Sequence, residues 1–143
     1  MYKSITAVKL MEFQQFGDER GHLVVAECGK EIPFHVQRVF YIYGSDSTVI
    51  RGRHANKKSE FVLVNVAGTS KVDVEDIYGA KKTYVLDHPH MGLYLPAMIW
   101  KDMYDFSKDS VLLCMSNQLY DGNEYIRNHD DFRALQREAK NGL

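Results

Sequence analysis

Residues 51–60 read RGRHANKKSE and lead directly into the apolar segment 61–66. Side chains two positions apart on a β-strand face the same side, so this pattern places His54, Asn56 and Lys58 along one surface. The sequence AGT at residues 67–69 then predicts a turn. We therefore interpret residues 51–66 as a pair of strands that presents a histidine, an amide and cations on one face.

Most of the remaining chain also consists of short β segments separated by turns. Many evenly spaced strands are typical of a β-sandwich or barrel. The strands that we expect cover residues 23–27, 38–43, 61–66, 70–76, 82–86, 92–96, 103–106 and 110–115.

The tail differs from this pattern. Asp130 can cap a helix whose apolar stripe consists of Phe132, Leu135 and Ala139. The sequence thus predicts an all-β barrel with a short C-terminal α-helix, in a single domain over residues 1–143.

The composition excludes several classes of protein. The 143 residues include 18 Lys and Arg against 19 Asp and Glu, which argues against a general nucleic-acid binder. No stretch approaches the roughly 20 apolar residues that span a bilayer, and the N-terminus lacks the features of a signal peptide. We expect a cytoplasmic protein that binds neither membrane nor nucleic acid. We expect Cys28 and Cys114 to be buried thiols rather than a disulfide.

The segment 51–60, with the later Gly68, resembles the first motif of the cupins, in which two histidines, a glutamate and a glycine have this spacing. Asn56 stands at the second histidine, and Glu60 is either a remnant of a metal ligand or a solvated carboxylate. Residues 92–101 resemble the second cupin motif, but Trp100 and Lys101 stand where a histidine is expected. The resemblance implies a cupin-type β-barrel, a jelly roll. One imidazole, an amide and an ammonium group are poor ligands for iron, nickel or zinc, so we expect no metal and no cofactor.

Five segments in the same order are similar to the sugar 3,4-ketoisomerases, the metal-free cupins that act on dTDP-4-keto-6-deoxyglucose. The resemblance implies an isomerase that moves the ketone from carbon 4 to carbon 3, for glycans such as lipopolysaccharide or S-layer glycans, and that forms a homodimer. In this family a histidine usually stands at the position of Asn56. The five segments are residues 18–25, residues 32–34 with 38–42, residues 51–57, residues 92–96 with Trp100, and residues 125–127 with 130–132.

The resemblance also suggests roles for individual side chains. His54 would remove the proton from carbon 3 and return it to carbon 4 through an enediolate, since histidine accepts and donates protons near neutral pH. Asn56, Tyr41 and Arg51 complete the predicted catalytic set, with Asn56 orienting an oxygen. The predicted substrate-binding residues are Arg20, Arg38, Tyr43, Lys57, Tyr94, Trp100, Lys101 and Arg127. Among them Arg38, Lys57 and Arg127 are candidates for the diphosphate.

Other interpretations stay open at this point. Because Asn56 cannot exchange a proton at neutral pH, the chain could instead be a nucleotide-sugar binding module without catalysis. A metal-free 3,5-epimerase on the same substrate is a further alternative, and a metal-dependent dioxygenase ranks last. Asn56 and Trp100 could also be purely structural. The apolar residues 5–16 could join the sheet of a partner subunit.

Overall fold

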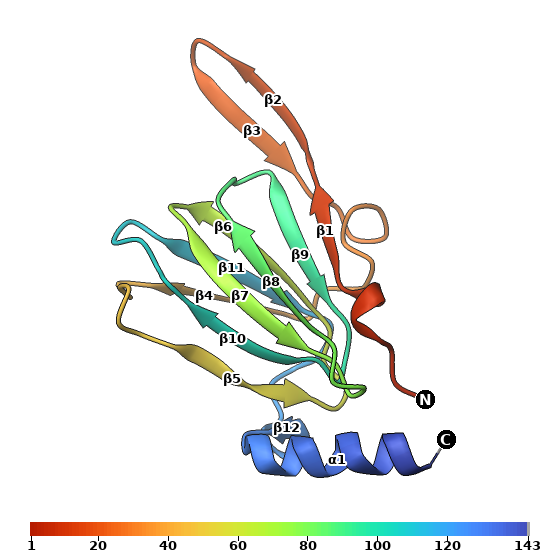
Figure 1. Cartoon of the computed structure of the whole chain (residues 1–143). Coiled ribbons are helices and arrows are strands. Elements are labelled where there is room, and N and C mark those ends of the chain that lie inside the picture. Colours follow the sequence, from red (N-terminus) through yellow and green to blue (C-terminus); the bar gives the residue numbers. More distant parts are fainter. Residues whose placement is uncertain (143) are drawn as a thin grey trace.

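The computed structural model describes residues 1–142, and two antiparallel β-sheets face each other in it (Figure 1). The strand order is β1-β9-β6-β11-β4 in the first sheet and β12-β5-β10-β7-β8 in the second. The first sheet contains β1 (Lys9–Glu12), β9 (Met91–Leu95), β6 (Phe61–Ala67), β11 (Val111–Ser116) and β4 (Arg38–Tyr43). The second contains β12 (Tyr125–Ile126), β5 (Arg51–Asn56), β10 (Trp100–Tyr104), β7 (Ser70–Glu75) and β8 (Lys81–Leu86). The predicted jelly-roll arrangement is confirmed.

The core between the sheets follows from the alternation of side chains along the strands. On β6, Phe61 and Leu63 face the other sheet, whereas Val62 and Val64 belong to a separate apolar cluster with Tyr94. The inner cluster also takes Val72 and Val74 from β7. Adjacent positions on one strand therefore serve different layers of the molecule.

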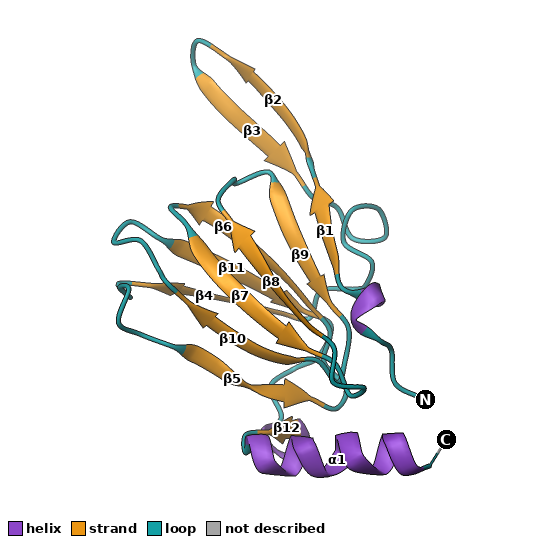
Figure 2. Cartoon of the chain, viewed as in Figure 1, coloured by secondary structure: helices purple, strands orange, loops and turns teal. Residues whose placement is uncertain are grey.

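The C-terminal helix α1 (His129–Asn141) lies below β5 and β12 (Figure 2). Phe132 is fully buried there against Trp100 and Ile126. The helix starts one residue before the expected cap, because Asn128 rather than Asp130 accepts a hydrogen bond from the first turn. The predicted helix is confirmed, and the identity of its cap was wrong.

A β-hairpin of β2 (Gln14–Asp18) and β3 (Gly21–Val25) projects beyond the two sheets (Figure 1). Phe16 and Leu23 pair across it and are 51% and 58% exposed. The short helices η1 (Ile5–Ala7) and η2 (Gly122–Glu124) complete the described elements.

Two expectations changed at the level of single segments. The strand expected from residue 103 begins at Trp100 instead, and the strand expected from residue 23 begins at Gly21. Cys114 is buried as expected, but Cys28 is exposed. Among residues 1–142, no helix has the length and apolar character needed to cross a membrane.

Candidate active site

A cavity of about 460 Å³ lies where β4 of the first sheet faces β5 of the second. Its inner wall comes from β6, β10 and β11. Tyr120, in the turn before β12, and Tyr125, in β12 itself, complete it. The cavity brings together six residues that the sequence predicted: Arg38, Tyr41, Arg51, His54, Lys101 and Arg127.

A bulge in β5 sets the direction of His54. His54 pairs with Lys101 and Gly52 pairs with Asp102, so Arg53 is an extra residue in the strand. Gly52 and Arg53 both have positive φ angles, of 80° and 56°. A Cβ atom at Gly52 would lie 3.0 Å from the carbonyl oxygen of Lys101, which explains the glycine at this close approach. As a result, Arg51 and His54 line the same cavity although they are three positions apart.

The His54 ring is held in one tautomer. Nδ1 lies 2.9 Å from the carbonyl oxygen of Gly52. A carbonyl only accepts hydrogen bonds, so we assign the ring proton to Nδ1, which leaves the lone pair on Nε2. Burial, together with the positive charge of Lys101, lowers the pKa of His54 to about 4. The imidazole is therefore a neutral base at neutral pH.

Lys101 is buried on β10 and joins a chain of hydrogen bonds behind the cavity. Its Nζ donates to Oδ1 of Asn56 over 2.8 Å, and Nδ2 of Asn56 donates to Oε2 of Glu124 over 2.8 Å. Glu124 also accepts from the hydroxyl of Ser59 and from the backbone N–H groups of Lys58 and Ser59. Burial lowers the pKa of Lys101 to about 7, although Glu124 opposes this shift.

Arg38 brings a second cation into the cavity from β4. Its guanidinium lies 5.5 Å from the ring centre of Phe40 and 5.9 Å from that of Phe61, and Nη1 donates to the Tyr125 hydroxyl over 3.3 Å. Nε and Nη2 are buried and have no hydrogen-bond partner among the described residues. Buried donors without partners cost stability, so these two nitrogens are available to an acceptor inside the cavity.

Two more cations stand where the cavity meets solvent. Arg51 and Arg127 are both exposed and line it. Arg127 stacks 4.4 Å from the ring centre of Tyr125 and donates from Nη2 to the Tyr120 hydroxyl over 3.3 Å. These arginines suit a charged group that stays partly in water.

The other predicted site residues lie outside this cavity. Asn56 is buried behind Lys101, and Tyr43 is 71% exposed and stacks on Tyr41. Tyr94 lies in the cluster on the outer side of the first sheet and donates to Glu60. Lys57 is exposed just after the end of β5, and Arg20 pairs with Asp18 on the projecting hairpin.

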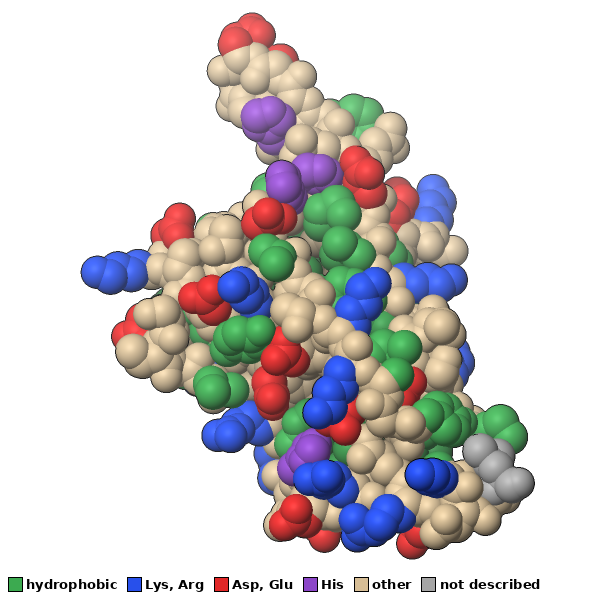
Figure 3. Space-filling view, viewed as in Figure 1, with side chains coloured by type: hydrophobic (Ala, Val, Ile, Leu, Met, Phe, Trp, Pro, Cys, Tyr) green, Lys and Arg blue, Asp and Glu red, His purple; other side chains and the backbone are tan. Residues whose placement is uncertain are grey.

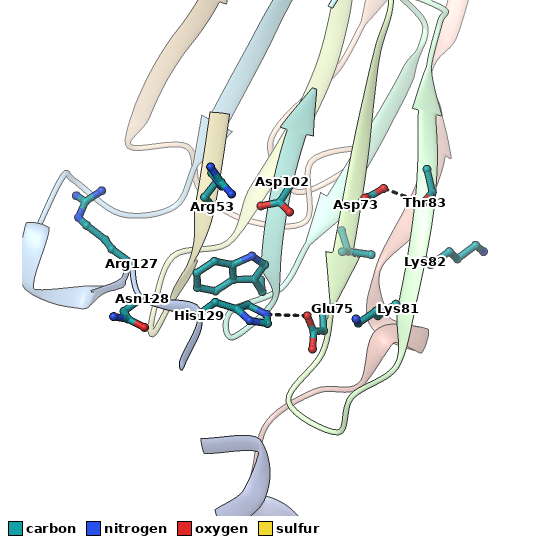
Figure 4. A pocket seen from close by; sticks show the side chains of 12 residues that line it. Arg53, Asp73, Glu75, Lys81, Lys82, Thr83, Asp102, Arg127, Asn128 and His129 are labelled. Carbon is teal, nitrogen blue, oxygen red and sulfur yellow. Dashed lines mark hydrogen bonds and ion pairs between the residues drawn. The ribbon is translucent and has the colours of Figure 1, made fainter. Parts of the chain in front are cut away.

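Trp100 also lies outside, against a larger cavity of about 1030 Å³ on the outer face of the second sheet. Figure 4 shows that Asp102 and Arg53 line this outer cavity, with His129 reaching Glu75. The His129–Glu75 contact is 3.0 Å long, and the ring centre of Trp100 is 4.7 Å from that of His129. Trp100 thus forms part of the wall that docks helix α1.

Sequence reasoning missed several residues in and around the cavity. Tyr120 and Tyr125 line the cavity and Glu124 anchors Asn56, yet all three belong to a turn or to the short strand that follows it. Their positions depend on the return of this segment onto β5, where Tyr125 pairs with Asn56. No periodicity in the sequence predicts that pairing.

The residues present do not fit the metal site of a cupin. At the cupin ligand positions His54 is accompanied by an amide and an ammonium group, and Asn56 and Lys101 are hydrogen bonded to each other. Among residues 1–142, no three His, Cys, Asp or Glu side chains gather in a way that could hold a metal ion. An ammonium group beside the single imidazole would repel a cation.

Comparisons with known proteins agree with this geometry. The FdtA family, described as WxcM-like, C-terminal, matches residues 6–137. The TDP-4-oxo-6-deoxy-alpha-D-glucose-3,4-oxoisomerase of Aneurinibacillus thermoaerophilus is 39% identical over 125 residues, which cover 87% of this chain and 89% of that protein.

The structure is also similar to solved structures of 3,4-ketoisomerases. A 3,4-ketoisomerase from Helicobacter canadensis superposes with a TM-score of 0.87 at 34% identity, covering 92% of this chain and 98% of that one. A His-to-Asn variant of the Thermoanaerobacterium thermosaccharolyticum 3,4-ketoisomerase QdtA, in complex with TDP-4-keto-6-deoxyglucose, has the same TM-score and 34% identity, covering 92% and 94%. The dTDP-4-dehydrorhamnose 3,5-epimerase of Bacillus anthracis is 17% identical with a TM-score of 0.77, covering 87% and 80%, and shares the fold.

Proposed function

The chain belongs to the WxcM-like family of sugar 3,4-ketoisomerases, and we propose that it converts TDP-4-keto-6-deoxyglucose into the 3-keto isomer. The relative from Aneurinibacillus thermoaerophilus carries this activity in its name, and the Thermoanaerobacterium thermosaccharolyticum relative was crystallised with this substrate. The observation that supports the proposal most is a neutral imidazole that lines a cavity of the right size for a sugar.

The chemistry starts at the carbon next to the ketone. A carbonyl at carbon 4 acidifies the hydrogen on carbon 3, and Nε2 of His54 is free to accept it because Nδ1 is bound to Gly52. Removing this proton places negative charge on the oxygen of carbon 4. The low pKa of His54 keeps the imidazole unprotonated, and therefore competent as a base, at neutral pH.

Arg38 is the best-placed group to stabilise the enediolate. Its two buried nitrogens without partners can receive the oxyanion, whereas water has little access to them. The sequence analysis assigned Arg38 to the diphosphate. We now assign the diphosphate to Arg51 and Arg127, which are exposed at the mouth of the cavity.

The 3,5-epimerase alternative is less well supported. A base that is paired with a carboxylate would be expected for that reaction, and the hydrogen-bond partner of His54 is the backbone of Gly52. The likeness to the epimerase extends only to the fold at 17% identity. A binding module without catalysis would not need a neutral base in the cavity.

One labelling experiment tests the proposal. The protein is incubated with TDP-4-keto-6-deoxyglucose in deuterium oxide, and product and label are followed by NMR and mass spectrometry. We expect the 3-keto product with deuterium on carbon 4, exchange at carbon 3 and none at carbon 5, and we expect His54→Ala to abolish both product and exchange. Exchange at carbon 5 would indicate an epimerase. Stabilisation by dTDP without any exchange would indicate a binding module.

We also propose that the chain forms a homodimer. The hairpin β2–β3 carries the exposed pair Phe16 and Leu23 and projects away from both sheets, as the space-filling view shows (Figure 3). A second copy is the occupant that fits this proposal, since apolar surface of this kind is normally covered in an assembly. Light scattering after gel filtration would give twice the mass of 16.5 kDa, and Phe16→Ser would lower that mass.

A further inference from the structure

Lys101 is a buried amine that the proposed chemistry leaves without a task. It pairs with His54 across the β10–β5 ladder, and both side chains line the cavity. Among the described residues, its Nζ contacts only the Asn56 oxygen at 2.8 Å and the Phe61 ring at 4.6 Å, and no carboxylate lies within ion-pair distance of it. An ammonium group has three donors, so at least one remains for the cavity.

The orientation of Asn56 is fixed by its two neighbours. Glu124 as a carboxylate can only accept, and Lys101 can only donate while it is protonated, so Nδ2 must face Glu124 and Oδ1 must face Lys101. A histidine at this position could make the same two contacts in one tautomer, donating to Glu124 and accepting from Lys101. Asn56 thus makes two contacts that a histidine could also make, but it cannot exchange a proton.

These contacts support an inference that rests on the proposed function and concerns the second proton transfer, to carbon 4. We propose that Lys101, held in place by Asn56, donates the proton to carbon 4, while His54 only removes the proton from carbon 3. Lys101 is then a second catalytic residue, and Asn56 is a positioning residue that acts through it. The replacement of the second family histidine by asparagine is in this view compatible with full activity.

The two steps balance as follows. His54 takes H⁺ from carbon 3, and the electron pair of that C–H bond forms a C3=C4 double bond with negative charge on the oxygen of carbon 4. Lys101 gives H⁺ to carbon 4, while the hydroxyl proton of carbon 3 moves to the oxygen of carbon 4 and leaves a ketone at carbon 3. The imidazolium then returns its proton, through water, to the neutral amine of Lys101.

The charges around the two groups favour this division of labour. Lys101 faces His54 on β5, Glu124 on η2, Cys114 on β11 and Arg38 on β4. Burial lowers the pKa of Lys101 to about 7 and that of His54 to about 4, so near neutrality a shared proton lies on the lysine. Burial raises the pKa of the Cys114 thiol to about 12, which leaves it uncharged.

Two substitutions separate the two proton transfers. In Lys101→Met and Lys101→Arg, we expect formation of the 3-keto product to fall by about 100-fold or more, the usual contribution of a general acid. Exchange of the carbon-3 hydrogen with deuterium oxide should stay within about tenfold of wild type, because His54 still forms the enediolate. Lys101→Arg keeps the charge and fills the space, so it controls for folding, which circular dichroism checks directly.

A test of Asn56 distinguishes positioning from simple stability. We expect Asn56→His to keep product formation within about tenfold, and Asn56→Leu to lower it by about 100-fold with carbon-3 exchange retained, as for the lysine variants. A purely structural role would reduce product and exchange together in Asn56→Leu.

Three results would overturn the inference. The first is a parallel loss of product and exchange in folded Lys101→Arg. The second is product formation near the wild-type rate in either lysine variant. The third is transfer of deuterium from carbon 3 to carbon 4 when the wild-type protein acts, in ordinary water, on substrate that carries deuterium at carbon 3. The last result needs no variant and would show that one imidazole performs both transfers. Failure of the proposed function is distinguishable, because the wild-type protein would then give neither product nor exchange.

Discussion

The two faces of the β5–β10 ladder carry very different chemistry, although they are built from neighbouring residues. Lys101 and His54 face a cavity of about 460 Å³ between the sheets, whereas Trp100, Asp102 and Arg53 line one of about 1030 Å³ on the outside. The inner cavity is smaller, yet it contains the two cationic or basic groups with the largest shifts in pKa towards neutral forms. The burial of the titratable side chains, rather than the volume of the cavity, therefore distinguishes the reactive side.

The partners of the polar groups show the same difference. On the outer face, His129 is bound to Glu75, and Asp73 accepts from Thr83 and Tyr104. On the inner face, Arg38 has two buried nitrogens without a partner. The outer face does contain one exception, since burial raises the pKa of Asp102 and its Oδ1 has no partner among residues 1–142. The inner face is prepared for a ligand, and the outer face is mostly satisfied by the protein itself.

The largest expected difference concerns one arginine on each face. Arg38→Met keeps the apolar stem but removes the donors for the enediolate, so we expect kcat to fall by about 100- to 1,000-fold. Arg53→Met, the matched change on the outer face, should leave kcat within about twofold. Steady-state assays of product formation measure both. Equal losses in the two variants would contradict the distinction between the faces.

The pH dependence should follow the inner groups alone. Product formation requires a neutral His54, which holds above its pKa of about 4, and a protonated Lys101, which holds below its pKa of about 7. We expect kcat/KM to be highest between these values and to fall by about 50-fold from pH 7 to pH 9, because about half of Lys101 is protonated at pH 7 and about 1% at pH 9. His129→Gln on the outer face should leave this profile unchanged, and a profile that stays flat to pH 9 would contradict the assignment to Lys101.

The smallest expected difference concerns stability. Burial acts to raise the pKa of Glu124, but hydrogen bonds from Ser59, Lys58 and Asn56 outweigh it, so the pKa lies below its ordinary value. We expect Glu124→Gln to lower the free energy of unfolding by about 1–3 kcal/mol, because the donors of Asn56, Ser59 and Lys58 lose a charged acceptor. Glu75→Gln on the outer face should cost less than about 1 kcal/mol, since its two donors lie nearer to solvent.

Urea unfolding at several pH values checks this prediction. A carboxyl with a depressed folded pKa stabilises the protein above its unfolded pKa and loses that effect as pH falls through the folded value. The difference in the free energy of unfolding between wild type and Glu124→Gln should therefore become smaller in acid. A difference that becomes larger in acid would contradict the charge that we assign to Glu124.

Most of the fold could be predicted from the sequence because β-strands and turns have local sequence patterns. Alternation and turn residues located most strands, and strand β4 was predicted with its observed limits, residues 38–43. His54 and Asn56 both reach Lys101's side of the ladder, as their spacing predicted, while Lys58 falls beyond the end of β5 at Asn56.

The candidate site was less accessible, for two physical reasons. Trp100 and Lys101 were both assigned to the pocket, yet neighbours on a strand point to opposite faces, and only the lysine lines the inner cavity. Glu124, Tyr120 and Tyr125 depend on the path of an irregular turn, which no pattern in the sequence fixes. Arg20 illustrates a further limit, because the resemblance assigned it to substrate while the hairpin carries it away from His54's cavity.

The extra residue at Arg53 makes the length of β5, and not only its composition, part of the site. The alternation of side chains between the two faces of the sheet shifts by one residue at the bulge. This shift allows Arg51 and His54 to line the same cavity. If the same residues were paired without a bulge, regular alternation would turn the side chain of Arg51 to the opposite side of the sheet from His54, with every side chain of the site still present. An insertion of one residue beside Arg53 should therefore be tolerated far less than a substitution of Arg53 itself.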